Sequence, residues 1–179
     1  MSHHGSRFHA RTAAEVGSCF KSTELARCLL EQNEQSPPLA YFELLLDRGM
    51  WADAVDFLAH GLSARDSVWW GCLCIRHVRL ARLDEQESAA LFRAGSWVVQ
   101  GTAAARELVK SAAAEVHDQS SPVRLVALAA AAGNGESSRT AHNIAAAIKM
   151  LAGSEAVLGE LLVIGLAIAE GKHSWETHS

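Results

Sequence analysis

The sequence has only 3 prolines and 1 tyrosine, and few runs in which β-branched or aromatic residues alternate with polar ones. Strands are typically built from such alternating runs, so their scarcity argues against a sheet. Alanine, which loses no side-chain entropy in a helix, is abundant instead. With 49 % hydrophobic residues in 179 positions, the chain can bury the core of a single domain. We therefore expect an all-α fold.

The chain also lacks a basic block and an acidic tail, and its formal net charge is −4. Proteins that bind nucleic acids neutralise phosphates with clustered lysines and arginines. Because no such cluster is present, we expect no nucleic-acid partner.

Long apolar runs are missing as well. The most apolar stretch, residues 156–169, is shorter than the roughly 20 residues that a membrane-spanning helix needs, and Glu160 interrupts it. We expect a buried core helix here and no membrane span. A membrane-surface protein that uses residues 156–169 is a competing interpretation.

Arg7 and Arg11 are not followed by the apolar segment of a secretory signal. We therefore expect a cytoplasmic protein, in which cysteines stay reduced. The thiols concerned are Cys19, Cys28, Cys72 and Cys74.

Helix start and stop signals predict about nine helices, and the short connectors between them favour antiparallel neighbours. A compact bundle and an irregular stack of helical hairpins both fit this pattern. We expect a flexible segment at 1–20, a single helical domain at 21–171 and a polar tail at 172–179. The predicted helices are 24–32, 39–48, 51–60, 64–82, 85–99, 103–116, 123–132, 141–152 and 155–170.

Two helix starts resemble capping boxes, in which the cap and the third helical residue bond each other's backbone. Ser63 precedes Asp66 in one, and Asp84 precedes Glu87 in the other. Apolar spacing places further side chains on inward faces. These are Leu25, Cys28, Leu91, Phe92, Leu108 and Val109.

The densest group of distinctive side chains lies in the helix predicted at 64–82. That helix is apolar nearly all round, which is typical of a helix buried among others. We expect it to be the central helix of the fold. Its structural core residues are then Trp69, Trp70, Gly71, Cys72 and Cys74.

Cys72 and Cys74 invite a catalytic or metal-binding interpretation. On a helix, residues at i and i+2 point about 200° apart, so the two thiols cannot hold one ion. No second cysteine or histidine pair accompanies them, and we expect no metal and no cofactor. Cys74 and His77 share a face, however. A thiol-dependent enzyme or sensor that uses Cys72, Cys74 and His77 is a second competing interpretation.

Arg76, Arg79 and Arg82 follow one another at intervals of three towards the end of the same helix. Such arginines can form a solvated edge that complements the helix dipole, or they can contact an acidic partner. Tryptophan is common at binding hot spots. We therefore name these arginines, with Trp51 and Trp97, as candidate partner-binding residues.

Residues 39–76 carry a recognisable pattern, which ends in S-V-W-W-G-C-L-C-I-R. The pattern resembles a family of uncharacterised bacterial all-helical proteins, a domain of unknown function with an A-V-W-W-x-C-x-C-x-R-like helix. Ser67 stands where alanine is common. The likeness covers most of residues 38–170, and this family is associated with type VI secretion gene neighbourhoods. The resemblance implies a helical accessory protein and supplies no catalytic residues.

These observations favour a non-enzymatic helical adaptor or scaffold that binds protein partners, accessory to a bacterial secretion system. They leave the identity of the partner and the formation of a homo-oligomer open.

Overall fold

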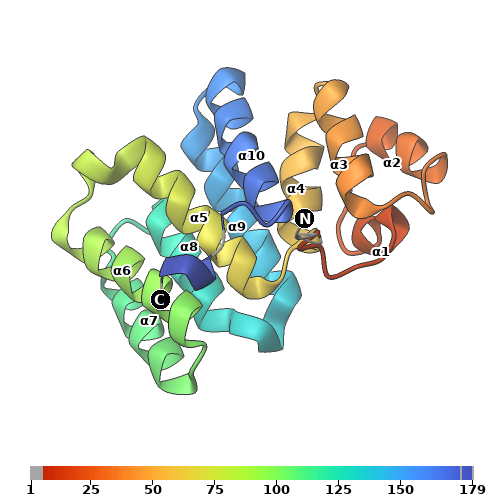
Figure 1. Cartoon of the computed structure of the whole chain (residues 1–179). Helices are drawn as coiled ribbons and strands as arrows, with labels where there is room; N and C mark the ends of the chain where they lie inside the picture. The colour runs from red at the N-terminus through yellow and green to blue at the C-terminus, as the bar shows by residue number, and fades with distance from the viewer. Residues whose placement is uncertain (1–5, 174, 179) are drawn as a thin grey trace.

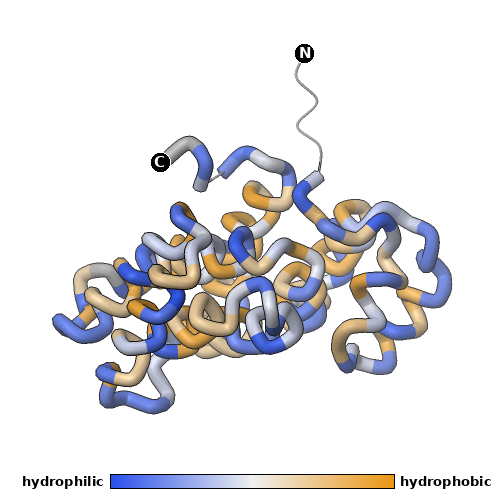
Figure 2. Tube along the Cα trace, turned by 90° about the horizontal axis from the view of Figure 1, so that it is seen from below, coloured by the Kyte–Doolittle hydropathy of each residue, from blue (hydrophilic) through white to orange (hydrophobic). Residues whose placement is uncertain are grey.

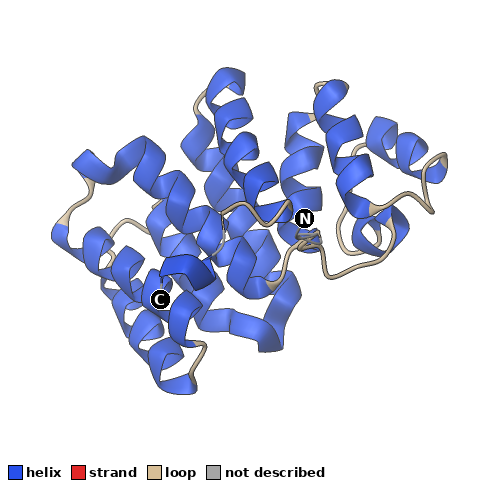
Figure 3. Ribbon diagram, viewed as in Figure 1, coloured by secondary structure: helices blue, strands red, loops and turns tan. Residues whose placement is uncertain are grey.

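Every regular element in the described residues, 6–173 and 175–178 of the computed structural model, is a helix (Figure 1, Figure 3). The all-α prediction is confirmed. The nine predicted helices are present as α2–α10, after a short α1. The bounds are α1 Ala13–Gly17, α2 Glu24–Glu31, α3 Pro38–Asp47, α4 Trp51–Gly61, α5 Ala64–Arg79, α6 Glu85–Gln100, α7 Ala103–Glu115, α8 Pro122–Ala132, α9 Ser137–Ala152 and α10 Glu155–Ala169. Short 3₁₀ helices lie at η1 Leu80–Arg82, η2 Gly133–Glu136 and η3 Trp175–His178.

Helices α5 and α9 share the centre of the molecule. Helix α5 contacts α6, α8, α9 and α10, and α9 contacts α4, α5, α8 and α10. In Figure 1, α1–α4 extend to one side of this pair, and α6 and α7 extend to the other. The hydropathy tube of Figure 2 places most apolar segments in the interior. The helix predicted as central therefore has a second helix beside it in that role.

The predicted caps form. The Asp66 amide donates to Ser63 Oγ at 3.2 Å, and the Glu87 amide donates to Asp84 Oδ1 at 2.7 Å. Ser121 caps α8, which begins with Pro122 at its first position. Each cap satisfies an N–H group that has no partner within its helix, and so sets where the helix begins.

In a capping box, the side chain of the third helical residue bonds the backbone N–H of the cap residue. The Glu87 side chain makes other contacts. It is 5 % exposed. Its Oε1 accepts a hydrogen bond from Ser121 Oγ at 2.6 Å and lies 3.7 Å from Arg79 Nη1. The Glu87 carboxylate of α6 therefore contacts the cap of α8 and the end of α5. Residue spacing within α6 does not predict these contacts.

Glycines permit the closest helix contacts of the core. A Cβ atom at Gly71 would lie 2.8 Å from Val126 Cγ2 and 3.0 Å from Ile144 Cδ1. A Cβ atom at Gly165 of α10 would lie 2.9 Å from the Trp70 indole. Both distances are well below ordinary van der Waals separation, so α5 can approach α8, α9 and α10 only because these side chains are absent.

The N-terminal segment differs from the flexible region expected at 1–20. Residues 6–20 include α1, whose Val16 is fully buried, and an isolated antiparallel bridge between Phe8 and Leu62. The Phe8 and Phe20 rings both pack against Phe57 of α4. Aromatic burial, rather than local helix signals, holds this segment in place. Residues 1–5 lie outside the described residues.

Four of the side chains predicted to face inwards are exposed, and Phe92, one of them, is described with the groove below. Leu25 is 70 % exposed, Cys28 is exposed and Leu108 is 51 % exposed. Asp53 of α4 accepts hydrogen bonds from the amide and hydroxyl of Thr23, the residue that caps α2, both at 2.8 Å. This anchor sets the rotation of the helix, so that Ala26 faces the core and its neighbour Leu25 does not.

Helix α10 uses most of its apolar surface inside the fold. Leu161, Leu162 and Ile168 are buried, whereas Val163 is 63 % exposed. Among the described residues, no helix combines the length and hydropathy required to cross a membrane.

Candidate interaction groove between helices α5 and α6

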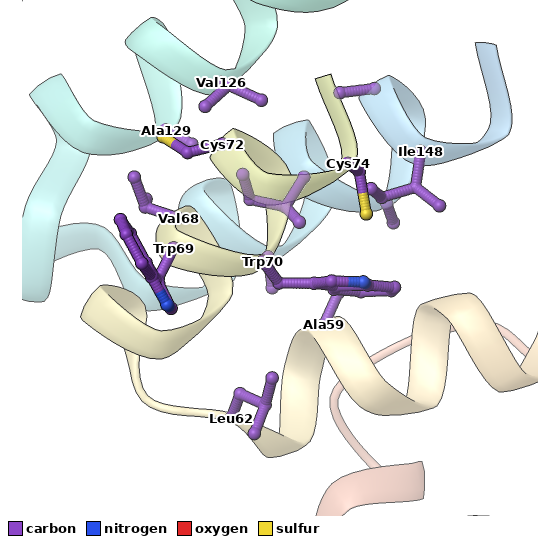
Figure 4. Close-up of a cluster of buried hydrophobic side chains, with 14 of the residues drawn as sticks. Ala59, Leu62, Val68, Trp69, Trp70, Cys72, Cys74, Val126, Ala129 and Ile148 are labelled. Atoms are coloured by element: carbon purple, nitrogen blue, oxygen red, sulfur yellow. The ribbon is translucent and has the colours of Figure 1, made fainter. Parts of the chain in front are cut away.

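The cysteines of α5 point to opposite sides of the helix. In Figure 4, Cys72 lies towards Val126 and Ala129 of α8, whereas Cys74 lies near Ile148 of α9. Trp70, which is fully buried, donates its indole N–H to the Leu161 carbonyl at 2.9 Å. The two thiols are therefore separate core side chains.

Thiolate chemistry is strongly disfavoured in this core. Burial raises the pKa of the Cys72 thiol to about 12, although Arg76 partly opposes the rise. Burial also raises the pKa of Cys74 well above its usual range, and the neighbouring Cys72 adds to the effect. His77 is exposed, with Nε2 3.1 Å from Glu160 Oε2. A nucleophilic cysteine needs exposure and a lowered pKa, and neither thiol has them.

Thiol labelling checks this arrangement. With a thiol-specific disulfide reagent, we expect Cys19 and Cys28 to react in the folded protein, because both are exposed. Cys72 and Cys74 should react only after unfolding. Peptide mapping after labelling identifies the modified residues. Rapid labelling of either α5 thiol in the folded protein would instead favour the thiol-dependent enzyme or sensor.

No cluster of three or more histidine, cysteine, aspartate or glutamate side chains in the described part of the chain has the arrangement of a metal site. A polar cluster elsewhere brings Arg7 and Trp175, from segments far apart in the sequence, together on α5. Asp66 Oδ1 lies 3.3 Å from Arg7 Nη1 and accepts the Trp175 indole N–H at 3.0 Å. The Arg65 guanidinium stacks 3.8 Å above the Trp175 ring. Trp175, which belongs to the polar tail expected at 172–179, is thus docked on α5.

The same arginine fixes the end of α6. Arg65 donates from Nε to the Val98 carbonyl and from Nη2 to the Val99 carbonyl, both at 2.7 Å. Two carbonyls of the last helical turn, which lack partners within the helix, are satisfied in this way. Two hydrogen bonds from one guanidinium therefore fix the position of α5 relative to α6.

A groove of about 600 Å³ lies between these helices. From α5 come Trp69 and Cys72, which are nearly buried, and Arg76, which is exposed. The remaining lining residues come from α6 and the connector before it. They are Leu83, Ser88, Leu91, Phe92, Gly95, Ser96, Val99 and Gln100.

Phe92 is the most exposed of the apolar side chains that line this groove, and it too was predicted to face inwards. It is 69 % exposed, whereas its neighbour Leu91 is 8 % exposed. The sequence contains a signal for this difference. The residues one helical turn from Phe92 are Ser88, Gly95 and Ser96, so a polar and small-residue face surrounds it. An exposed aromatic ring beside an apolar groove is typical of an interaction surface.

The five candidate partner-binding residues do not form one surface. Arg76 lines the groove, and Arg82 is exposed in η1. Arg79 is half-buried against Glu87. Trp51 is half-buried on α4, where its ring faces Gly159 of α10.

Trp97 is 3 % exposed and belongs to the core. Its indole would lie only 3.3 Å from a Cβ atom at Gly133. It therefore cannot contact a partner without unfolding of this region, and Phe92, five residues earlier, is the aromatic side chain that α6 exposes.

A second hollow region surrounds His60. Two adjoining cavities, of about 450 and 730 Å³, share Cys19, His60 and the start of α9. The His60 ring stacks on Phe20 with 5.4 Å between centroids. Burial lowers the pKa of His60; Asp56 opposes this, whereas His142, His9 and Lys149 lower it further. Asp56 is itself paired with Lys149 at 2.7 Å.

This lowered pKa makes stability depend on pH. An unfolded histidine has a pKa of about 6.5, so the unfolded chain binds more protons than the folded one below that value. The contribution of neutral His60 is fully present above pH about 6.5 and declines as the pH falls towards the lowered folded pKa. We expect the wild type to lose more stability between pH 7 and 5 than His60→Gln, measured by urea unfolding. The exposed His173→Gln is the control and should behave like the wild type. Parallel curves for all three proteins would contradict the assignment.

Comparisons with known proteins match the chain to a family and assign it no function. No curated protein matches the chain, and no solved structure matches it. A family model described as a family of unknown function (DUF6931) matches residues 41–171. That match runs from α3 to the end of α10 and contains both walls of the groove. The chain belongs to this family of unknown function, DUF6931.

Proposed function

We propose that the protein is a non-enzymatic adaptor that binds a segment of a partner protein in the α5–α6 groove. The observation that carries the proposal is Phe92, which is 69 % exposed at the edge of a 600 Å³ groove with a largely apolar lining. An exposed aromatic side chain beside a preformed apolar hollow is the usual arrangement of a binding hot spot. We further propose, from the family resemblance of residues 39–76, a role in the bacterial cytoplasm as an accessory to a secretion system.

The other regions of the chain support this function over its two alternatives. The thiols of α5 are buried with raised pKa values, which disfavours a thiol-dependent enzyme or sensor. The apolar residues of α10 mostly face α4, α5 and α9, which disfavours a membrane-surface role for residues 156–169. Among the groove, the α5 thiols and α10, the groove alone combines exposed apolar surface with open volume.

Comparative co-purification from the native host tests the proposal. Three tagged proteins are compared: the wild type, Phe92→Ala and Val163→Ala. The control, Val163, is also a large exposed apolar residue, but it lies on α10 outside the groove. We expect one protein to be recovered with the wild type and with Val163→Ala, and about tenfold less of it with Phe92→Ala.

The identified protein is then purified and its affinity measured by calorimetry. Equal affinity for the wild type and Phe92→Ala would contradict binding in the groove. Recovery of no partner, together with turnover of a small molecule, would contradict the adaptor function itself.

A further inference from the structure

We infer that the groove takes an amphipathic helix of a partner protein and that this helix carries a carboxylate opposite Arg76. The inference rests on the proposed function and specifies the chemistry of its partner. Three properties of the groove lead to it: the apolar floor, the small residues beside Phe92 and the charge at the mouth.

The floor matches the apolar face of a helix. Trp69 is 8 % exposed and Leu91 is 8 % exposed, so each shows only part of its side chain to the groove. Helices α5 and α6 have their backbone groups bonded internally along the groove, apart from their ends. A peptide that binds by strand addition needs a free strand edge, which this site does not offer. A helix needs no such edge, because its backbone is already satisfied.

The outer face of α6 combines one large side chain with small neighbours, which is the ridge-and-groove surface that helix packing requires. Phe92 projects from it, with Ser88 one turn before and Gly95 and Ser96 one turn after. A Cβ atom at Gly95 would meet nothing within 4 Å, so the fold itself does not require glycine there. Glycine within a helix nevertheless costs about 0.5–1 kcal/mol relative to alanine. A partner helix that packs closely against α6 accounts for the missing side chain, because interaxial distances of about 8–10 Å depend on small residues at the crossing.

The charge at the groove has one sign. Arg76 is the only charged residue among those that line it. Arg79, one turn further along α5, is already paired with Glu87. Arg93 lies beside the groove, with its guanidinium carbon 5.9 Å from the Phe92 ring centroid, and is exposed. A partner with aspartate or glutamate beside its apolar stripe would therefore complement the groove, and a lysine at that position would be repelled.

A displayed peptide library tests the inference with a defined probe. Each peptide is an amphipathic helix of about 15 residues, with leucines fixed at i, i+3, i+4 and i+7 and with randomised flanking positions. The full-length protein is the target, as wild type, Arg76→Glu and the charge-reversal control Arg139→Glu, which lies outside the groove at the start of α9. We expect the wild type and the control to enrich Asp and Glu at flanking positions, and Arg76→Glu to enrich Lys and Arg.

Binding of one selected peptide is then measured by fluorescence anisotropy. We expect Phe92→Ala and Gly95→Leu each to weaken binding about tenfold or more, without loss of helical circular dichroism. Absence of binders, enrichment independent of charge, or a preference unchanged by Arg76→Glu would overturn the inference. Self-association of the wild type that Phe92→Ala abolishes would overturn it too, because the occupant would then be a second copy. A partner that co-purifies through Phe92 but binds without an acidic helix would overturn the inference and leave the proposed function standing.

Discussion

Replacement of Trp70 by alanine is expected to lower the free energy of unfolding by about 3–5 kcal/mol, which is typical for removal of a buried aromatic side chain. Trp70 is fully buried in α5, and its indole N–H bonds the Leu161 carbonyl of α10. The variant loses the packing of the ring, leaves a cavity and deprives that carbonyl of a partner. Urea unfolding at constant pH, followed by circular dichroism, measures the change.

Two further variants separate these contributions. Trp70→Phe keeps most of the apolar volume but removes the hydrogen bond, so we expect a smaller loss of about 1–3 kcal/mol. Trp51→Ala removes a half-buried indole on α4, outside the centre of the core, and should cost less than Trp70→Ala. A loss below about 1 kcal/mol for Trp70→Ala would show that α5 is not the buried helix described above.

The second large effect is expected at Gly165. Gly165→Ala places a methyl group against Leu58 and 2.9 Å from the Trp70 indole, so neighbouring side chains must shift. We expect a net loss of about 1–3 kcal/mol, as for other overpacked cores. The matched control is Gly95→Ala, in another helix with open space around the glycine. It should raise stability by about 0.5–1 kcal/mol, because alanine is the better helix former.

The opposite signs of these two substitutions are the readout, again by urea unfolding. The cost at Gly165 should shrink in the Trp70→Phe background, since a smaller ring leaves room for the methyl group and neighbouring substitutions are not additive. Stabilisation by Gly165→Ala would contradict the close approach of α5 and α10.

Helix positions were predictable because their signals are local. Thr102, Ser121 and Ser154 each accept a hydrogen bond from a backbone N–H in the first turn of the helix that they precede. A cap and the apolar spacing after it are both contained within one or two turns. This is why the order of nine helices could be derived from the sequence.

Helix rotations were less predictable because distant contacts decide them. Helix α2 is turned by the hydrogen bonds of Thr23 to Asp53, thirty residues away. Residues 6–20 are held by phenylalanine contacts with α4, which no local pattern indicates. The groove also required the structure, because the polar and small residues around Phe92 indicate an exposed ring but do not show that α5 and α6 enclose a hollow beside it.

Photo-crosslinking in the native host tests the central claim most directly, which is that a protein partner occupies the α5–α6 groove. A photoreactive amino acid replaces Phe92 in one variant and Val163 in the other, and both positions are exposed. We predict that position 92 forms a crosslink to one defined protein, that position 163 does not, and that Gly95→Leu in the first variant removes the crosslink. Equal crosslinking from both positions, or none from position 92, would contradict the claim.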